Sequence, residues 1–204
     1  MMGAEILIAD DHSMIRKGLK LYMQMNLGYK NINEVSTCNE LMRELVKKKY
    51  THLVLDIILS DGSSLEVIPN IRRVYPDLQI MIFSMQPADI YGEALKQYGI
   101  NYYLSKSAGE EEIILALQKF LLNETLVQTP QAFENIDNPF RSLAPRELEI
   151  LHYVLKGIGT KDIAETLNLK MNTVSTIKTR IYEKTNASNI KELIELATLY
   201  NVNY

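Results

Sequence analysis

Short apolar runs alternate with longer amphipathic stretches along the first 122 residues of the chain. The strand candidates cover residues 5–9, 33–36, 52–56, 79–84 and 101–104. The stretches between them repeat apolar residues at helical spacing over residues 14–25, 39–48, 64–74, 88–98 and 110–122. Strands and helices in this alternation are joined by right-handed crossovers and form a parallel sheet covered on both faces. The sequence therefore predicts a doubly wound, five-stranded α/β domain over residues 1–122.

The rest of the chain has a different pattern. Over residues 123–141 the periodicity fades, which is typical of a linker with at most one short helical piece. Beyond it the patterns are helical only, over residues 145–156, 160–167, 172–184 and 190–200. Four short helices with tight connections predict a small all-α domain over residues 142–204.

Charge and composition limit the class of protein more than they define it. The net charge of the chain is −3, but residues 141–204 carry nine Lys and Arg against seven Asp and Glu, which leaves −5 on the rest. A surplus this small permits nucleic-acid binding without establishing it. The single Cys38 excludes an internal disulfide, and no apolar run reaches the roughly 18–20 residues that span a bilayer. With no signal-peptide pattern at its start, the chain is expected in the reducing cytoplasm and away from membranes.

Polar side chains follow four of the predicted strands at the same end. Asp10 and Asp11 follow the first strand, Asp56 and Ser84 end the third and fourth, and Lys106 closely follows the fifth. In a doubly wound sheet this end is where ligands bind. Three converging carboxylates repel one another unless a cation neutralises them, and hard oxygen ligands suit Mg²⁺. We therefore expect a magnesium site here.

Asp56 is the candidate nucleophile of this site, since a strand-end carboxylate can accept a phosphoryl group. Lys106 would balance charge on the phosphoryl oxygens, and the Ser84 hydroxyl could donate a hydrogen bond to one of them. Taken singly, such residues are more often turn, capping or surface residues. Their placement at one end of different buried strands is what favours a common function.

These motifs resemble the receiver domain of two-component response regulators. The similarity lies in residues 6–12 with the acidic pair, 53–56 with the phosphoacceptor, 83–84 with the hydroxyl and 103–106 with an aromatic residue three before the lysine. It extends over roughly residues 4–122 and implies a flavodoxin-like fold and a histidine kinase as partner. The family commonly has proline and glycine where Ser60 and Ser64 stand, so the loop after Asp56 is expected to follow a different path.

The resemblance also implies roles for individual residues. Mg²⁺ would be bound by Asp10 or Asp11, by Asp56 and by the backbone carbonyl of Ile58. Ser84 and Tyr103 would rearrange together after phosphorylation and alter the surface around the fourth helix, fifth strand and fifth helix. The aromatic ring of Tyr103 alone would more often indicate simple packing.

Two short amphipathic helices joined by a tight turn, over residues 160–167 and 172–184, describe a helix-turn-helix. Val174, Ile177 and Ile181 recur on one face of the second helix and are expected to point inward. Small hydroxyl side chains on the other face would allow close approach to the major groove of DNA. The candidate DNA contacts are Lys161, Thr173, Ser175, Thr176, Lys178, Thr179, Arg180 and Lys184.

Residues 143–151, 161–164 and 173–178 resemble the LuxR-type DNA-binding domain, and the whole chain is similar to the NarL/FixJ class of response regulators. In that class residues 172–184 correspond to the recognition helix, and the last helix commonly pairs two domains. Ala144 stands where the family often has a capping threonine, and Lys170 where it has serine. Asn172 could cap the recognition helix instead.

Together these patterns predict a transcription regulator that accepts a phosphoryl group on Asp56 from a kinase, and then dimerises and binds promoter DNA. Its only chemistry would be Mg²⁺-dependent self-phosphotransfer and slow autodephosphorylation. Two alternatives are open. One is a receiver-like module that no longer cycles phosphate. The other is a haloacid-dehalogenase-like phosphatase, although Ile58 stands where such enzymes carry a second aspartate.

Overall fold

The computed structural model describes residues 4–124 and 138–202. By contacts the chain divides into two compact units. The first comprises Met1–Met85 and Tyr98–Gln128, and the second Gln86–Gln97 and Thr129–Tyr204. The domain boundaries predicted at residues 122 and 142 stay predictions. Most of the expected linker at 123–141 lies outside the described residues.

Five parallel strands form the sheet of the first unit, as the sequence predicted. Their order across the sheet is β2 (Ile32–Val35), β1 (Ile6–Ala9), β3 (His52–Leu55), β6 (Gln79–Ser84) and β7 (Tyr102–Ser105). The strand order reverses between β1 and β3, so the crevice at their carboxyl ends is the expected ligand site. The doubly wound α/β fold is confirmed.

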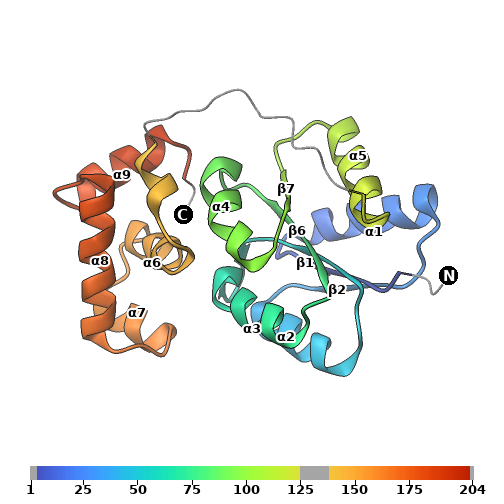
Figure 1. Ribbon diagram of the computed structural model, residues 1–204, viewed down its shortest axis with the longest axis horizontal. Coiled ribbons are helices and arrows are strands. Elements are labelled where there is room, and N and C mark those ends of the chain that lie inside the picture. The colour runs from blue at the N-terminus through green and yellow to red at the C-terminus, as the bar shows by residue number, and fades with distance from the viewer. Residues whose placement is uncertain (1–3, 125–137, 203–204) are drawn as a thin grey trace. The chain divides into compact units, whose positions relative to one another are not determined.

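Helices cover both faces of this sheet (Figure 1). The helices α1 (Ser13–Leu27) and α5 (Glu110–Leu121) lie on one face, where Met23 and Phe120 pack with Ile8, Val54 and Phe83 in a buried core. On the other face lie α2 (Cys38–Lys47) and α3 (Ile68–Val74). Because both faces are buried, the central strands β1, β3 and β6 are almost continuously apolar, which is typical of a parallel sheet.

After β3 the sequence predicts one helix over residues 64–74. The start of that prediction is wrong. A small antiparallel hairpin, β4 (Ile58–Leu59) and β5 (Gly62–Ser63), is followed by a 3₁₀ turn, η1 (Ser64–Glu66), and only then by α3. Pro69 lies in the first turn of α3, where its missing N–H does no harm, so the helix cannot begin much earlier. The Ser64 side chain is meanwhile bonded to the Asp56 backbone.

The second unit is helical throughout its described residues. Its elements are α4 (Ala88–Leu95), η3 (Pro139–Ser142), α6 (Pro145–Leu155), α7 (Thr160–Thr166), α8 (Met171–Thr185) and α9 (Ile190–Leu199). The 3₁₀ turn η2 (Lys96–Tyr98) follows α4 and ends at the first residue that returns to the first unit. The apolar face of α6 is fully buried at Leu148 and Leu151, and α8 packs against α6 and α7. The predicted all-helical domain is confirmed. None of the helices within 4–124 and 138–202 combines the length and apolar composition that a bilayer-spanning helix requires.

The ends of two helices in this unit explain the departures at Ala144 and Lys170. At the start of α6 the carboxylate of Glu147 accepts a hydrogen bond from the Ala144 backbone N–H at 2.8 Å, so part of the cap is kept without a hydroxyl. The helix α8 begins at Met171 with Lys170 as its N-cap residue, and no side chain caps it there. The expectation that Asn172 caps this helix is therefore wrong, since Asn172 lies inside the first turn.

Candidate functional site

Two buried aspartates follow the neighbouring strands β1 and β3. The strand ends Ala9 and Leu55 are register partners, and the Asp56 backbone N–H donates to the Ala9 carbonyl at 2.8 Å. Only 2% of Asp10 and 4% of Asp56 is exposed. Because little water screens them, two ionised carboxylates here raise each other's energy. The sheet thus brings these two residues together at the point where its strand order reverses, and the pocket needs positive charge.

Lys106 supplies one such charge. Its backbone N–H donates to the Ser84 carbonyl at 2.9 Å, which fixes the residue just beyond the end of β7. Its Nζ atom lies 2.6 Å from Asp10 Oδ2 and 2.5 Å from Asp56 Oδ2. Burial raises the pKa of Asp56 above its ordinary value, although hydrogen bonds from Lys106 and Ser84 oppose that rise. One ammonium group shared by two buried carboxylates leaves the pocket short of positive charge.

Asp11 and His12 complete the polar lining on the β1 side. Asp11 is partly exposed, and its Oδ1 lies 2.7 Å from Nδ1 of His12. Single ligand atoms of Asp10, Asp11, His12 and Asp56 all lie within 4.8 Å of one another. Carboxylate oxygens at this spacing are the donors that Mg²⁺ prefers, so the residues present fit the expected cation.

No role was predicted for His12 from the sequence, and the structure places it within this group. The signal was its position directly after the acidic pair. Ile58, expected to offer its backbone carbonyl, begins the hairpin two residues after Asp56 and is half-buried. Its backbone N–H points to Asp56 Oδ1 across a long 3.4 Å.

Ser84 and Tyr103 lie on the same face of the sheet. Tyr103 is the register partner of Ile82, and Ile82 and Ser84 share a face because side chains alternate along β6. Ser84 is buried, whereas Tyr103 is half-buried. The two residues predicted to rearrange together are therefore diagonal neighbours on adjacent strands, and Ser84 also bonds Asp56.

The second unit contains the predicted helix-turn-helix, formed by α7 and α8. Val174 and Ile181 are buried as expected, while Ile177 is half-buried. The opposite face of α8 exposes most of the candidate DNA contacts, namely Thr173, Ser175, Thr176, Thr179 and Arg180. The hydroxyls of Thr176 and Thr179 bond backbone carbonyls one turn earlier in the helix. Each hydroxyl oxygen keeps acceptor capacity for an outside partner.

The candidate lysines differ in how free their ammonium groups are. Lys161 is 71% exposed and has a distant partner in Glu165 at 3.9 Å. Lys178 is half-buried and donates to the Thr160 hydroxyl at 3.2 Å. Lys184 donates to Glu147 Oε2 at 2.7 Å and also bonds a backbone carbonyl, so it joins α8 to the start of α6. Its role as a phosphate contact stays a prediction, and a structural role is evident beside it.

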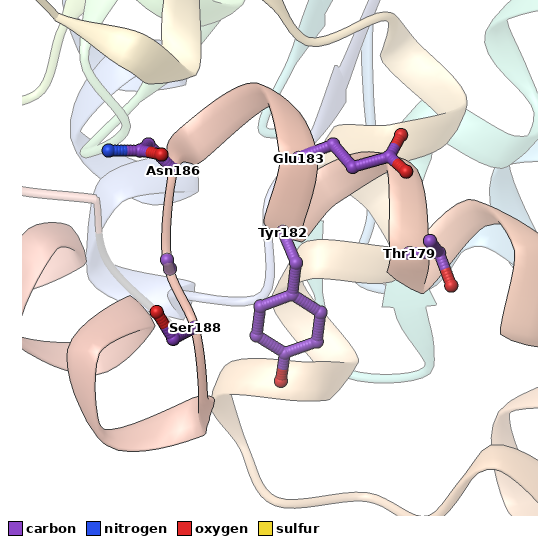
Figure 2. Close-up of a pocket in the computed structure, with 6 residues that line it drawn as sticks. Thr179, Tyr182, Glu183, Asn186 and Ser188 are labelled. Carbon is purple, nitrogen blue, oxygen red and sulfur yellow. The ribbon is translucent and has the colours of Figure 1, made fainter.

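A shallow hollow of about 370 Å³ lies at the C-terminal end of α8 (Figure 2). Its lining consists of Thr179, Tyr182, Glu183, Asn186, Ala187 and Ser188. The one ionisable acid there, Glu183, would repel a phosphate group. This hollow therefore adds nothing to the expected DNA contacts beyond the position of Thr179.

Two protein families match successive parts of the chain, and the first match includes α4, which the division by contacts groups with the second unit. Residues 6–118 match the family described as "Response regulator receiver domain", and residues 141–197 match "Bacterial regulatory proteins, luxR family". Similar curated proteins include the "Oxygen regulatory protein NreC" of Staphylococcus carnosus, at 30% identity over 95% of this chain and 96% of that protein. The NreC protein of Staphylococcus aureus strain MRSA252 is 31% identical over the same shares.

Solved structures show the same fold. RcsB from Salmonella enterica serovar Typhimurium, bound to promoter rprA with a phosphomimetic, superposes with a TM-score of 0.80 at 22% identity. That similarity covers 96% of this chain and 99% of RcsB. RcsB bound to promoter P1flhDC gives a TM-score of 0.82 at 21% identity, over 97% and 99% of the two chains. At this identity the likeness concerns the fold alone.

Proposed function

Because this chain belongs to the response regulators, with a receiver domain followed by a LuxR-type domain, we propose that phosphoryl transfer to Asp56 controls the binding of α8 to promoter DNA. The observation that carries the proposal is the pocket in which one buried ammonium group, that of Lys106, bridges Asp10 and Asp56. Membership in a family of regulators argues against the phosphatase alternative. The complete pocket favours a receiver that still cycles phosphate.

In the proposed transfer a carboxylate oxygen of Asp56 attacks the phosphorus of a phosphohistidine on the partner kinase. The new O–P bond forms as the P–N bond breaks, and the leaving imidazole takes up a proton. Lys106 balances charge on the phosphoryl oxygens, and the Ser84 hydroxyl can donate to one of them. Attack of water on the acyl phosphate later restores Asp56, so the chain undergoes slow autodephosphorylation and is not an enzyme that turns over a substrate.

Mg²⁺ would be held by Asp10, Asp11, Asp56 and the backbone carbonyl of Ile58. The ligand atoms of the three carboxylates already lie close together. When bound, the ion supplies the positive charge that the pocket needs to accept a phosphoryl group. The pKa of Asp56 is raised by burial, and a nucleophile must be ionised. A nearby cation favours the ionised form of Asp56.

The response to phosphorylation is proposed to pass through Ser84 and Tyr103. When the Ser84 hydroxyl moves toward the phosphoryl group, it frees space on its face of the sheet. The side chain of its diagonal neighbour Tyr103 can then move into that space. Such a movement shifts an existing equilibrium between two arrangements. The altered surface would favour a homodimer, which doubles the DNA contacts over two half-sites.

For DNA, α8 is proposed to enter the major groove with the small side chains of Thr173, Ser175 and Thr176 toward the bases. Lys161 on α7 and Arg180 on α8 would contact phosphates. The remaining candidate contacts on α8 are Lys178, Thr179 and Lys184. A regulator of bacterial promoters works in the cytoplasm, which is where we place this chain. The RcsB structures bound to promoters support this arrangement by analogy of fold only.

A small phosphodonor tests the proposal directly. The full chain is incubated with acetyl phosphate and Mg²⁺, and its intact mass is compared with that of an Asp56→Asn variant. We expect one phosphoryl adduct in the wild type, none in the variant, and tighter binding to DNA sites selected in vitro. Absence of an adduct in the wild type overturns the phosphoryl switch. An adduct that changes neither DNA affinity nor oligomeric state overturns the coupling.

A further inference from the structure

Ser64 occupies a position, eight residues after the phosphoacceptor, where related receivers usually have glycine, and its side chain has a specific partner. The residue is completely buried. Its hydroxyl donates to the backbone carbonyl of Asp56 at 2.8 Å. Its backbone N–H donates to the carbonyl of Ile57, also at 2.8 Å. We propose that Ser64 is a positioning residue, which fixes the two peptide groups that directly follow the phosphoacceptor Asp56.

The two bonds fall on consecutive carbonyl groups. The peptide plane that contains the Asp56 carbonyl and the plane that contains the Ile57 carbonyl are each held by one donor of Ser64. The next carbonyl along the chain is that of Ile58, the expected cation ligand. Since a peptide group is rigid, fixing two successive planes limits the directions that the third carbonyl can take. A glycine would supply the backbone donor but not the hydroxyl.

The hairpin beyond Ile57 is anchored at both ends. At its base Ser64 directly follows β5, and Ile58 pairs with Ser63 across the ladder. At its tip Asp61 accepts hydrogen bonds from the backbone N–H groups of Cys38 and Asn39, at 2.6 and 3.0 Å. The bonds at the tip are exposed to water, whereas the Ser64 bond is buried and is not weakened by competing water. The buried bond is the one that sets the geometry next to Asp56.

An ordinary structural role for Ser64 would be to start the 3₁₀ turn. That role belongs to Ser63, whose hydroxyl accepts from the Leu65 backbone N–H at 3.3 Å. Ser63 is as deeply buried as Ser64, with 1% exposed. The chain thus carries a matched pair of adjacent buried serines. One bonds the turn that follows, and the other bonds the phosphoacceptor backbone.

The inference rests on the proposed function in taking the cation to bind at Asp10, Asp11, Asp56 and the backbone carbonyl of Ile58. Its test measures binding of Mn²⁺ to the full chain, with no phosphodonor, from the loss of the free-ion paramagnetic resonance signal. Asp56→Asn, which should bind Mn²⁺ far more weakly, shows that the ion is in this pocket. Thermal unfolding is recorded in parallel for the wild type, Ser64→Ala, Ser64→Gly and Ser63→Ala.

We expect Ser64→Ala and Ser64→Gly to raise the Kd for Mn²⁺ roughly fivefold, as the loss of one buried hydrogen bond implies. Ser63→Ala should lower the unfolding temperature but keep the Kd within about twofold, because its change is local to the turn. If Ser64→Ala does not fold, Ser64→Gly alone decides. Unchanged Mn²⁺ affinity in a folded Ser64 variant overturns the positioning role and leaves the proposed function standing. No Mn²⁺ binding by the wild type overturns the pocket and the inference together.

Discussion

The Nζ atom of Lys106 lies 2.5 Å from Oδ2 of Asp56, and the two side chains expose only 3% and 5% of their surface. A second buried carboxylate, that of Asp10, lies 2.6 Å from the same ammonium group. Removing one member of such a group leaves the others charged and unpaired, which is more destabilising than the intact group is stabilising. The stability of the first unit is therefore tied to the same atoms that are proposed to handle the phosphoryl group.

Replacing Lys106 by methionine should lower the free energy of unfolding by about 3 kcal/mol in the absence of divalent cations, because two carboxylates then face each other without a counter-charge. Mg²⁺ at millimolar concentration should restore part of that loss, since the ion can take over the neutralisation. Thermal unfolding of the variant with and without Mg²⁺ measures both effects.

Lys47→Ala is the control for this experiment. Lys47 pairs with Glu44 at 3.5 Å but is 70% exposed, so its removal should change little. A Lys106 variant as stable as the wild type, or one that gains nothing from Mg²⁺, would contradict the view that the pocket lacks positive charge.

The basic side chains of the second unit should divide into two groups when DNA binding is measured over a range of salt concentrations. Lys161→Ala and Arg180→Ala should weaken binding to all sequences and reduce the slope of log affinity against log salt by about one unit each. Lys184→Ala should leave the slope near its wild-type value, because its ammonium group is held by Glu147. Fluorescence anisotropy with labelled duplexes gives these slopes.

The structural role of Lys184 is tested by a double-mutant cycle with Glu147→Gln. Each single change should lower the unfolding free energy by about 1 kcal/mol, and the double variant should lose less than the two together. Additive losses, combined with a reduced salt slope for Lys184→Ala, would instead place this lysine on a phosphate.

Much of this architecture could be predicted because it follows from local patterns. Each strand of the sheet was placed within one residue of its observed bounds, since apolar runs of strand length can be recognised without any partner. The convergence of Asp10, Asp56 and Lys106 followed from topology alone, because parallel strands present the same ends at one edge. The order of the motifs along the chain then indicated the family.

The features that escaped prediction depend on side-chain bonds between distant segments. Nothing in the residues around Ser64 shows that its hydroxyl reaches the Asp56 carbonyl, so the predicted helix was extended over a first turn that does not form. The bond between Lys184 and Glu147 joins residues 37 positions apart, and the bond between Asp61 and Cys38 joins residues 23 apart. Periodicity records which face of an element is apolar and carries no information about such pairs.

Asp61 gives a further prediction. Its carboxylate accepts from the first two backbone N–H groups of α2, where the helix dipole favours negative charge. Asp61→Ala should therefore destabilise the start of α2 by about 1 kcal/mol and speed hydrogen exchange at Cys38 and Asn39. Asp61→Asn, which keeps an acceptor, should be milder.

Thr37→Ala is the matched control for Asp61. The Thr37 hydroxyl accepts from the Glu40 N–H at 2.9 Å, one position further along the same turn. Its removal should speed exchange at Glu40 and leave Cys38 nearly unchanged. Equal effects of the two variants on both amides would show that the whole end of α2 frays as one unit, with no separate contribution from Asp61.

The pH dependence of the second unit should be governed by His152. This side chain lies on α6 with only 4% exposed, and burial, with Lys156 nearby, lowers its pKa to about 4. An unfolded histidine has a pKa of about 6.5, so between these two values the unfolded chain binds a proton that the folded chain does not. The stabilisation is present above pH 6.5 and is lost as the pH falls toward 4, by an amount on the order of 3 kcal/mol.

Burial also lowers the pKa of His52 in the first unit, so the measurement must separate the two units. Hydrogen exchange of individual amides between pH 7 and pH 4.5, corrected for intrinsic rates, separates α6 from β3. His152→Leu should flatten the pH dependence of exchange in α6 and leave that in β3 unchanged. A variant whose α6 amides lose protection with acid as steeply as the wild type would show that another group controls this unit.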